Sequence, residues 1–328
     1  MKIAVINSSP EVYNLATHRI ARYHWGLGDE VAITNGGALF LPEVWQAEKA
    51  YFSCIFTWDL PAMVTNINLL KDRGVAIEIG GPATTAMPLW VENQTGIKSH
   101  VGLDNRFEFV KGDFKMSYSS RGCRNKCLWC AVPRTEPFCV EYDDFNIPVG
   151  EHPQLNDNCI LNTSLEHQKL VVEKLKDVLS VDINSGFEAA LFTEEAYKLY
   201  SQLHLARWRL AFDSMKVEKE FERATAILRN HGIRYSAIST YVLIGFPGTS
   251  MGENIYRLEK TRELGCTPYP QRYVPLNSLK HKYTAKGFDN FELERLRSYW
   301  VSANVWRTCT FEQFKVNYPE PMQGEKLL

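Results

Sequence analysis

Short apolar segments alternate with segments of helical spacing along the first hundred residues. The apolar runs lie at 2–7, 30–34, 52–58 and 75–82, and the helical segments at 11–25 and 61–74. Consecutive strands separated by a helix pair in parallel, because a parallel connection needs a crossover of that length. The pattern therefore predicts a Rossmann-like parallel sheet with helices on its faces, over residues 1–105.

The alternation continues with a longer period after residue 115. Predicted strands lie near 115–118, 158–162, 180–184, 207–213, 235–244 and 270–274, and predicted helices near 165–179, 193–204, 216–231 and 250–264. Thr193 and Ser250 are suited to cap helices, and Gly232 and Gly265 to end them. Six strands with right-handed crossovers predict a partial (βα)6 barrel over 106–280. The amphipathic segment 288–313 predicts a helical extension over 281–328, which completes an α/β fold class.

Composition sets limits on the class of protein. The chain has 328 residues, 45% hydrophobic and 12% aromatic, which is enough to build a sizeable core. Its formal net charge of −1 gives no overall argument for nucleic-acid binding. The N-terminal apolar run is too short for a signal peptide, and no stretch is long enough to span a membrane. We therefore expect a cytoplasmic protein, in which clustered cysteines more often bind metal than form disulfides.

Three of the eight cysteines lie within the segment "SYSSRGCRNKCLWCAVPR" at 117–134. Cys123, Cys127 and Cys130 can converge only if the backbone curls, which Gly122 permits. A closed structural zinc site and a ferredoxin cluster each want four ligands, whereas three thiolates on a four-iron cluster leave one iron open. A zinc loop completed by Cys139 or a histidine is the alternative. The other single cysteines are expected to be packing residues: Cys54, Cys159, Cys266 and Cys309.

These three cysteines, spaced by three and two residues with Trp129 just before the last, resemble the signature of radical S-adenosylmethionine enzymes. The flanking "SSRGC" resembles the subgroup with an N-terminal cobalamin-binding-type domain. The barrel resemblance covers residues 115–277. It implies a [4Fe–4S] cluster on Cys123, Cys127 and Cys130 whose open iron chelates S-adenosylmethionine.

The resemblance also implies an activity. One-electron reduction, from an external donor of flavodoxin or ferredoxin type, would cleave S-adenosylmethionine to a 5′-deoxyadenosyl radical that abstracts hydrogen from a substrate. The sequence does not identify that substrate. A cobalamin-dependent radical methyltransferase is an alternative, and a non-catalytic iron–sulfur or zinc-binding protein is the alternative from another class.

Polar residues at predicted strand ends are candidates for cofactor binding. In "WRLAFDS" (208–214), Arg209 and Asp213 share the face opposite the apolar one, and a charge facing a barrel interior needs a ligand or a partner. Strand 180–184 offers Asp182 and Asn184 and continues to Glu188. A structural ion pair between strands is the alternative interpretation.

The resemblance adds further positions. The end of the second barrel strand, "NTS" (Asn162, Thr163 and Ser164), would receive the methionine amino group, although it departs from the glycine-glycine-glutamate form of that motif. Gly245 in "YVLIGFPGT" would lie along the adenine, which Trp129 would flank. Arg272 and Tyr273 are candidates for the substrate side, with core or surface roles as the alternative.

The N-terminal segment carries a weaker resemblance, through its glycine-glycine-proline turn at 80–82. The axial-ligand motif aspartate-x-histidine-x-x-glycine is absent. His18 and His24 fall within a predicted helix, where surface or core roles are expected. Cobalamin is therefore not favoured as a cofactor.

Overall fold

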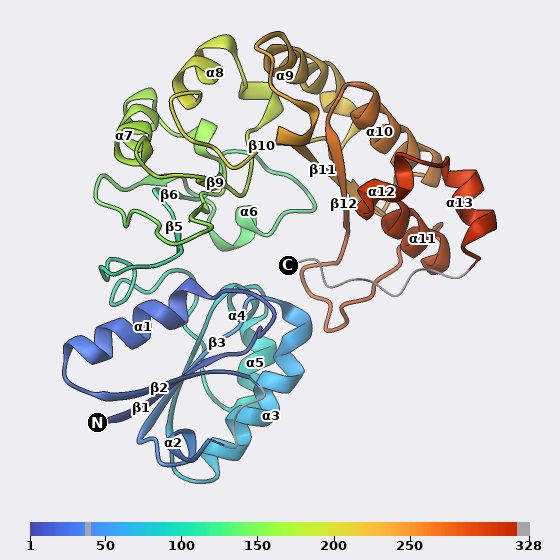
Figure 1. The fold of residues 1–328 in the computed structure, drawn as a ribbon. Helices are drawn as coiled ribbons and strands as arrows, with labels where there is room; N and C mark the ends of the chain where they lie inside the picture. Colours follow the sequence, from blue (N-terminus) through green and yellow to red (C-terminus); the bar gives the residue numbers. More distant parts are fainter. Residues whose placement is uncertain (37–40, 320–328) are drawn as a thin grey trace. The chain divides into compact units, whose positions relative to one another are not determined.

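The computed structural model describes residues 1–36 and 41–319 (Figure 1). The chain forms two compact units, each described by itself below. The first contains Met1–Glu151 and Pro275–His281, and the second contains His152–Val274 and the residues from Lys282 onward. The boundaries between these units, after residues 151, 274 and 281, differ from those of the three predicted domains, which end at residues 105, 280 and 328. The class is α/β with parallel sheets.

The first unit is built on a four-stranded parallel sheet of order β2-β1-β3-β4. The strands are β1 (Lys2–Asn7), β2 (Glu30–Asn35), β3 (Lys49–Ser53) and β4 (Ala76–Gly80). In the register, Ile3 of β1 lies between Val31 of β2 and Lys49 of β3. The first, second and fourth predicted strands are confirmed; the third, predicted at 52–58, is displaced to Lys49–Ser53, and residues 57–59 form a 3-10 turn.

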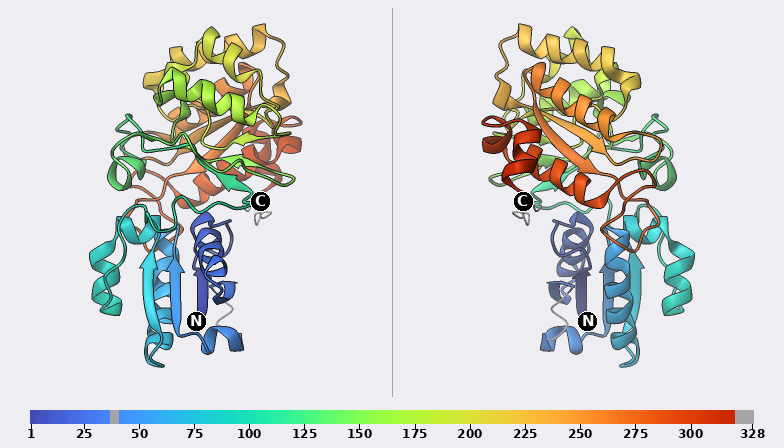
Figure 2. Two further views of the ribbon diagram at one scale, coloured as in Figure 1. Left: turned by 90° about the vertical axis from the view of Figure 1, so that its left-hand side faces the viewer. Right: turned by 90° about the vertical axis from the view of Figure 1, so that its right-hand side faces the viewer.

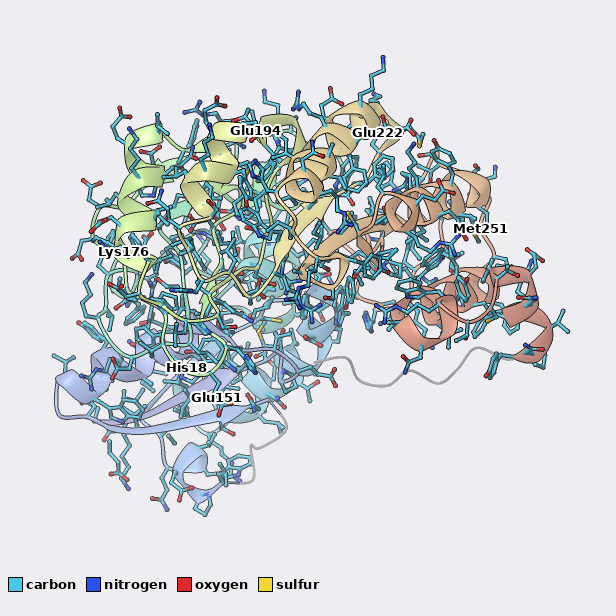
Figure 3. All side chains as sticks on the ribbon, turned by 45° about the horizontal axis from the view of Figure 1, so that its top comes forward. His18, Glu151, Lys176, Glu194, Glu222 and Met251 are labelled. Atoms are coloured by element: carbon cyan, nitrogen blue, oxygen red, sulfur yellow. The ribbon has the colours of Figure 1, made fainter. Side chains whose placement is uncertain are left out.

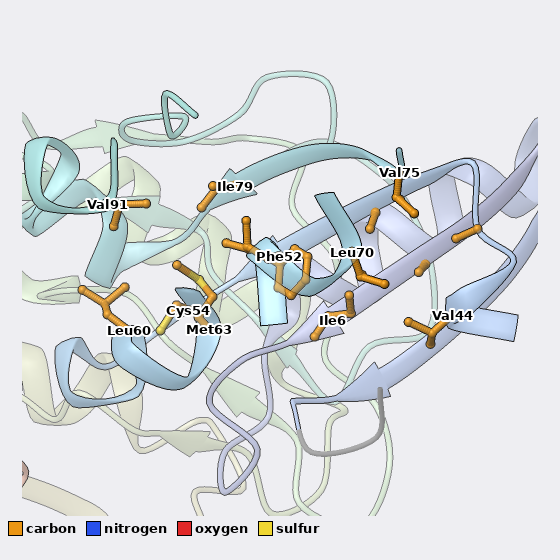
Figure 4. Packing of buried hydrophobic residues seen from close by; sticks show 14 of the residues in the cluster. Ile6, Val44, Phe52, Cys54, Leu60, Met63, Leu70, Val75, Ile79 and Val91 are labelled. Carbon is orange, nitrogen blue, oxygen red and sulfur yellow. The ribbon is translucent and has the colours of Figure 1, made fainter. Parts of the chain in front are cut away.

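Alternate residues of the sheet pack on opposite faces, as strand geometry requires. Ile6 and Phe52 pack with Met63 and Leu70 of α3 (Leu60–Lys71) on one face (Figure 4). Ile3, Val5 and Tyr51 pack with Ile20 of α1 (Leu15–Gly26) on the other. Helices accordingly lie on both sides of this sheet (Figure 2).

The remaining elements of the first unit are short. They are α2 (Pro42–Trp45), α4 (Pro82–Ala86), α5 (Pro88–Thr95), β5 (Met116–Ser117), β6 (Ser120–Arg121), α6 (Val132–Thr135) and β7 (Val140–Glu141). The segment 275–281 joins this unit late in the chain. Thr57 Oγ1 donates to the carbonyl of Ser278 at 2.6 Å, and the rings of Trp58 and His281 stack at 4.7 Å.

The second unit contains two sets of parallel strands. β8 (Gln154–Leu155) pairs with β9 (Asp182–Ile183), and β10 (Trp208–Ala211), β11 (Ile238–Ile244) and β12 (Thr267–Arg272) form a three-stranded parallel sheet. A parallel bridge joins Phe187, which follows β9, to Leu210 of β10. The helices between these strands are α7 (Leu165–Leu175), α8 (Glu194–Tyr200), α9 (Glu218–Asn230) and α10 (Met251–Glu263).

Local capping signals in the second unit are confirmed. The side chain of Thr193 accepts from the N–H of Ala196, and that of Ser250 accepts from the N–H of Glu253. Each bond satisfies one N–H that a helix start leaves open. Gly232 and Gly265 have φ of +76° and +76° just after their helices, a conformation that favours glycine.

One predicted strand is wrong, and one predicted helical segment is divided into three helices. Residues 160–162 form a 3-10 turn in place of the strand at 158–162, because the N–H of Asn162 bonds back to Cys159 O at 3.0 Å and Thr163 Oγ1 to Ile160 O at 2.7 Å. The segment 288–313 is divided into α11 (Asn290–Val301), α12 (Ala303–Trp306) and α13 (Phe311–Asn317). The first break falls at Ser302, whose backbone is extended.

None of the helices within the described ranges combines the length and the apolar character that crossing a bilayer requires.

Gly81 offers a test of the first unit. Its φ is +108°, and a Cβ there would lie 2.5 Å from the carbonyl oxygen of Cys54. We expect Gly81→Ala to lower the free energy of unfolding by about 3 kcal/mol or more, since strain and a backbone clash add. Gly74→Ala is the matched control, because φ is +80° but nothing lies within 4 Å. It should cost only about 1–2 kcal/mol. Urea midpoints that are equal for the two variants would contradict the clash.

Candidate functional site

The cysteine segment belongs to the first unit, and a short antiparallel pair closes its base. β6 pairs with β7 so that Arg121 lies opposite Val140. Gly122 has φ +83°, and a Cβ on it would lie 1.8 Å from the carbonyl oxygen of Phe138. Only glycine allows this approach of the two backbones. The predicted role of Gly122, to let the chain turn before Cys123, agrees with this geometry.

An ion pair ties the base of the loop to its far end. Arg121 Nε donates to Glu136 Oε2 at 2.7 Å and Nη2 donates to Oε1 at 2.5 Å. The two side chains are only 17% and 15% exposed, so the pair is partly shielded from water. A bidentate arginine–carboxylate pair fixes both distance and orientation. It therefore joins the two ends of the segment 122–135, which carries the three cysteines.

The arginine of this ion pair also contacts the ring of a buried tyrosine, Tyr118. The guanidinium of Arg121 lies 4.9 Å from the ring centre of Tyr118, and that of Arg19 of α1 lies 4.6 Å from the same ring. Arg19 Nη1 also donates to the Tyr118 hydroxyl. Burial raises the pKa of Tyr118, so the phenol stays neutral and the contact is a cation–π one. The base of the loop is thereby anchored to the sheet's covering helix.

The three clustered cysteines are half-buried in irregular chain. Cys123 Sγ accepts from the N–H of Asn125 at 3.4 Å, and the N–H of Cys130 donates to the carbonyl of Cys127 at 3.1 Å. Leu128, between the second and third, is 76% exposed. The loop thus presents its thiols close to solvent, with its apolar tip outward.

The core cysteines differ in chemistry. Cys54 and Cys266 are fully buried, and burial raises the pKa of the Cys54 thiol to about 12 and that of Cys266 to about 11. Because metals are bound by the thiolate, these two are poor ligands. The expectation that they are packing residues is consistent with their full burial.

The donor set of the loop fits an iron–sulfur or zinc centre by its chemistry, since it offers three partly accessible thiols in eight residues. Among residues 1–36 and 41–319, no group of three or more His, Cys, Asp or Glu side chains stands in an arrangement that could hold a metal ion. The fit therefore rests on residue type, spacing and access.

In the second unit, Arg209 of β10 forms an ion pair across to β9. Its Nε donates to Asp182 Oδ1 at 2.7 Å and its Nη2 to Oδ2 at 2.6 Å, while Nη1 donates to the Tyr241 hydroxyl at 3.0 Å. Burial opposes the charge, but the hydrogen bonds of Asp182, together with the charge interactions of Tyr241, Asp182 and Tyr269, outweigh it, and the pKa of Arg209 is raised. The structural ion pair between strands, one of the two interpretations of these residues, is thus present.

Asp213 and Asn184 also take part in contacts between strand ends. Asp213 Oδ1 accepts from the N–H of Leu243 in β11 at 2.9 Å. The carbonyl of Asn184 accepts from Tyr241 at 3.1 Å, and its side chain donates to Asn156 at 3.1 Å. Arg209 and Asn184 therefore share the Tyr241 hydroxyl as a partner, and Asn184 and Asp213 lie just past the carboxyl ends of β9 and β10. The part of Glu188 in cofactor binding stays a prediction.

The remaining predicted cofactor residues have clear local roles. The Ser164 side chain accepts from the N–H of His167 and so caps α7, and Asn162 and Thr163 are both buried in the preceding turn. Gly245 follows β11 with φ +75°, and a Cβ on it would meet Leu293 Cδ1 at 3.1 Å. Trp129 is half-buried beside Cys130.

Arg272, a candidate for the substrate side, holds the following loop in place. Its Nη2 donates to Tyr283 O at 2.6 Å, Thr284 Oγ1 at 2.8 Å and Asn290 Oδ1 at 2.6 Å. Its Nη1 pairs with Glu294. These bonds explain the arginine as a brace of the segment 283–294.

Three side chains in these networks escaped the sequence analysis. Glu136 and Arg19 have no local pattern that reveals their partners, since Arg19 and Tyr118 are 99 residues apart. Arg257 lies in α10 and is fully buried, with Nη1 donating to Phe212 O at 2.9 Å. Its spacing within an amphipathic helix was the one available signal, because a charge on the apolar face of a helix needs a buried acceptor.

Comparison with known proteins gives no family assignment: neither a protein-family model nor a curated protein matches the chain.

The Arg209–Asp182 pair makes a direct prediction. Asp182→Asn should lower the free energy of unfolding by about 2–4 kcal/mol, because it leaves a largely shielded guanidinium without its counter-ion. The exposed Asp177→Asn should change it by about 0.5 kcal/mol or less. Urea denaturation followed by circular dichroism measures both. A loss no larger for Asp182→Asn than for Asp177→Asn would remove the pair from the stabilising contacts.

Proposed function

We propose that the protein is a radical S-adenosylmethionine enzyme, with a [4Fe–4S] cluster held by Cys123, Cys127 and Cys130. The observation that carries the proposal is a set of three half-buried cysteines in one loop. The ion pair between Arg121 and Glu136 joins the two ends of that loop. Such a cluster, when bound, supplies one-electron reductive cleavage of S-adenosylmethionine, and the resulting 5′-deoxyadenosyl radical abstracts hydrogen from substrate. The substrate is not assigned.

The chain's own residues would fix and shield this loop. Gly122 lets the backbone pass against Phe138, and the Arg121–Glu136 pair limits how far the loop can open. A ligand loop with fixed ends loses less entropy when its side chains close on a metal. The three thiolates would neutralise part of the charge of the iron ions and leave one iron coordination position open.

In the second unit, the residues predicted to bind the cofactor follow its parallel strands. Its strands β8 to β12 are parallel within each set, which supports the expected partial barrel, and sites in such folds lie at the carboxyl ends of the strands. Asn184 and Asp213 lie at those ends, and the backbone after β11 turns at Gly245. Arg209 would act by holding the Tyr241 hydroxyl and Asp182 in position.

One observation favours a second candidate, a zinc-binding loop. Cys139 follows Phe138, and its backbone nitrogen would lie 3.0 Å from a Cβ on Gly122, so the fourth cysteine is close to the base of the loop. Four thiolates are what a closed structural zinc site requires. The iron–sulfur proposal is preferred because the spacing of Cys123, Cys127 and Cys130 is sufficient without Cys139.

Replacing any one of Cys123, Cys127 or Cys130 by alanine should remove most of the iron and sulfide after anaerobic reconstitution, and with them the cleavage of S-adenosylmethionine. Each thiolate binds a different iron, and two ligands do not retain the cluster. Iron and sulfide analysis with detection of 5′-deoxyadenosine measures both. Cys266→Ala is the control, since that thiol is buried in the core. A loop variant with full iron content and activity would falsify the assignment.

Cys139→Ala separates the two candidates. Under the iron–sulfur proposal this variant retains iron, sulfide and S-adenosylmethionine cleavage close to the parent level. Under the zinc alternative, the parent binds one zinc ion tightly and Cys139→Ala loses about 100-fold or more in zinc affinity, because a ligand and its charge are removed. Metal analysis by mass spectrometry after each reconstitution gives the answer. Stoichiometric zinc without iron in the parent protein would reject the iron–sulfur proposal.

A further inference from the structure

A cavity of about 390 Å3 opens at the carboxyl ends of β1 and β2 in the first unit. Asn7 and Asn35, the last residues of the two strands, line it together with Tyr13, His18 and Lys115. In parallel α/β sheets, ligands bind where loops leave the carboxyl ends of the strands. The volume falls within the range of small-molecule sites. This cavity involves none of the residues of the cysteine loop.

The wall beside α1 is aromatic with a cation at its edge. The rings of Tyr13 and His18 stack with their centres 4.3 Å apart and an interplanar angle of 18°. Lys115 Nζ lies 4.6 Å from the centre of the Tyr13 ring. His18 lies in the first turn of α1 (Figure 3). The stack is a rigid surface that loses little entropy when a ligand docks, and the ammonium gives it a positive rim.

The floor of the cavity is held rigid by side-chain amides. Asn7 Nδ2 donates to Asn35 Oδ1 at 3.2 Å, and Asn7 Oδ1 accepts from Asn14 Nδ2 at 3.2 Å. Asn14 also donates to Ser53 Oγ at 3.0 Å. Asn35 Oδ1 accepts from Asn7, and the side-chain NH2 of Asn35 is the group that can donate to a ligand. The floor therefore presents a donor next to the cationic rim.

The charges of the wall favour an anion. Burial, and then the positive charge of Lys115, lower the pKa of His18, so the imidazole is neutral near pH 7 and Lys115 carries the positive charge of this wall. Burial raises the pKa of Tyr13 to about 12, which keeps the phenol neutral as well. The first turn of α1 contains no acidic residue that would oppose an anion. Glu11, the acidic residue among those that line the cavity, is exposed to solvent, which screens its charge.

We propose that this cavity binds a small phosphate ester, with its phosphate beside Lys115 and the Asn35 amide and its organic part against the Tyr13–His18 stack. An ammonium and an amide donor match the oxygens of a phosphate, and the flat stack matches an aromatic group of nucleotide size. A bound phosphate offsets the effect of Lys115 on His18 and so raises the pKa of this histidine. By linkage, the ester binds more tightly as the pH falls through that pKa.

Calorimetric titration of the full-length protein with adenosine 5′-monophosphate, inorganic phosphate and adenosine tests the proposal. We expect saturable binding of the monophosphate, weaker binding of inorganic phosphate and still weaker binding of adenosine. Lys115→Met should weaken monophosphate binding about tenfold or more, since a charge-assisted hydrogen bond is lost. Lys111→Met is the matched control, because Lys111 is exposed nearby and pairs with Asp144 at 2.6 Å. It should leave the affinity within about twofold, as expected for a surface pair.

The ring protons of His18 provide a second readout in solution. Titration by nuclear magnetic resonance should give a higher pKa for His18 in the presence of saturating monophosphate, in the parent and in Lys111→Met. Equal affinity for adenosine and the monophosphate, binding of inorganic phosphate alone, or unchanged affinity in Lys115→Met would each overturn the proposal. These measurements need neither iron nor S-adenosylmethionine, so their outcome is independent of the proposed activity.

Discussion

Parallel strand pairing is the constraint from which the rest of this molecule follows. Between each pair of parallel neighbours the chain must cross over one face of the sheet, and helices serve as those crossings. Both faces are then covered, as α1 and α3 cover the two faces of the first sheet. The loops at the carboxyl ends of the strands are left to carry polar side chains. The cavity beside Asn7 lies at such ends, and Asn184 and Asp213 lie just past the ends of β9 and β10.

The features that the sequence predicts well are those with local causes. The centre of strand β1, residues 3–6, is an unbroken apolar run, and the caps at Thr193 and Ser250 depend on the residue three positions on. The wrong strand at 158–162 shows the limit of such reasoning. Its apolar residues are buried as expected, but side-chain and backbone bonds over three residues close them into a turn. Burial alone does not distinguish the two conformations.

The site illustrates the same division. The three cysteines are visible in the sequence because their spacing is local, and the choice of Arg209 and Asp213 follows from strand alternation. The residues that contact these side chains are not visible in the sequence. Nothing near Arg121 in the sequence identifies Glu136 as its acceptor, and the contact of Arg19 with Tyr118 exists only once the fold brings them together. Long-range partners of this kind depend on tertiary structure, which no residue pattern encodes directly.

The late segment 275–281 has a consequence for how the protein is made. Leu279 packs against the same core as Leu60 and Phe52, and Ser278 accepts its bond from Thr57, 221 residues earlier. A ribosome has therefore synthesised most of the chain before the first unit can receive its last piece. Until that segment is synthesised, the first unit lacks the packing of Leu279 and the bond to Ser278, and contacts of such high sequence separation form late. Cutting the gene after residue 151 would yield a fragment that lacks part of its own core.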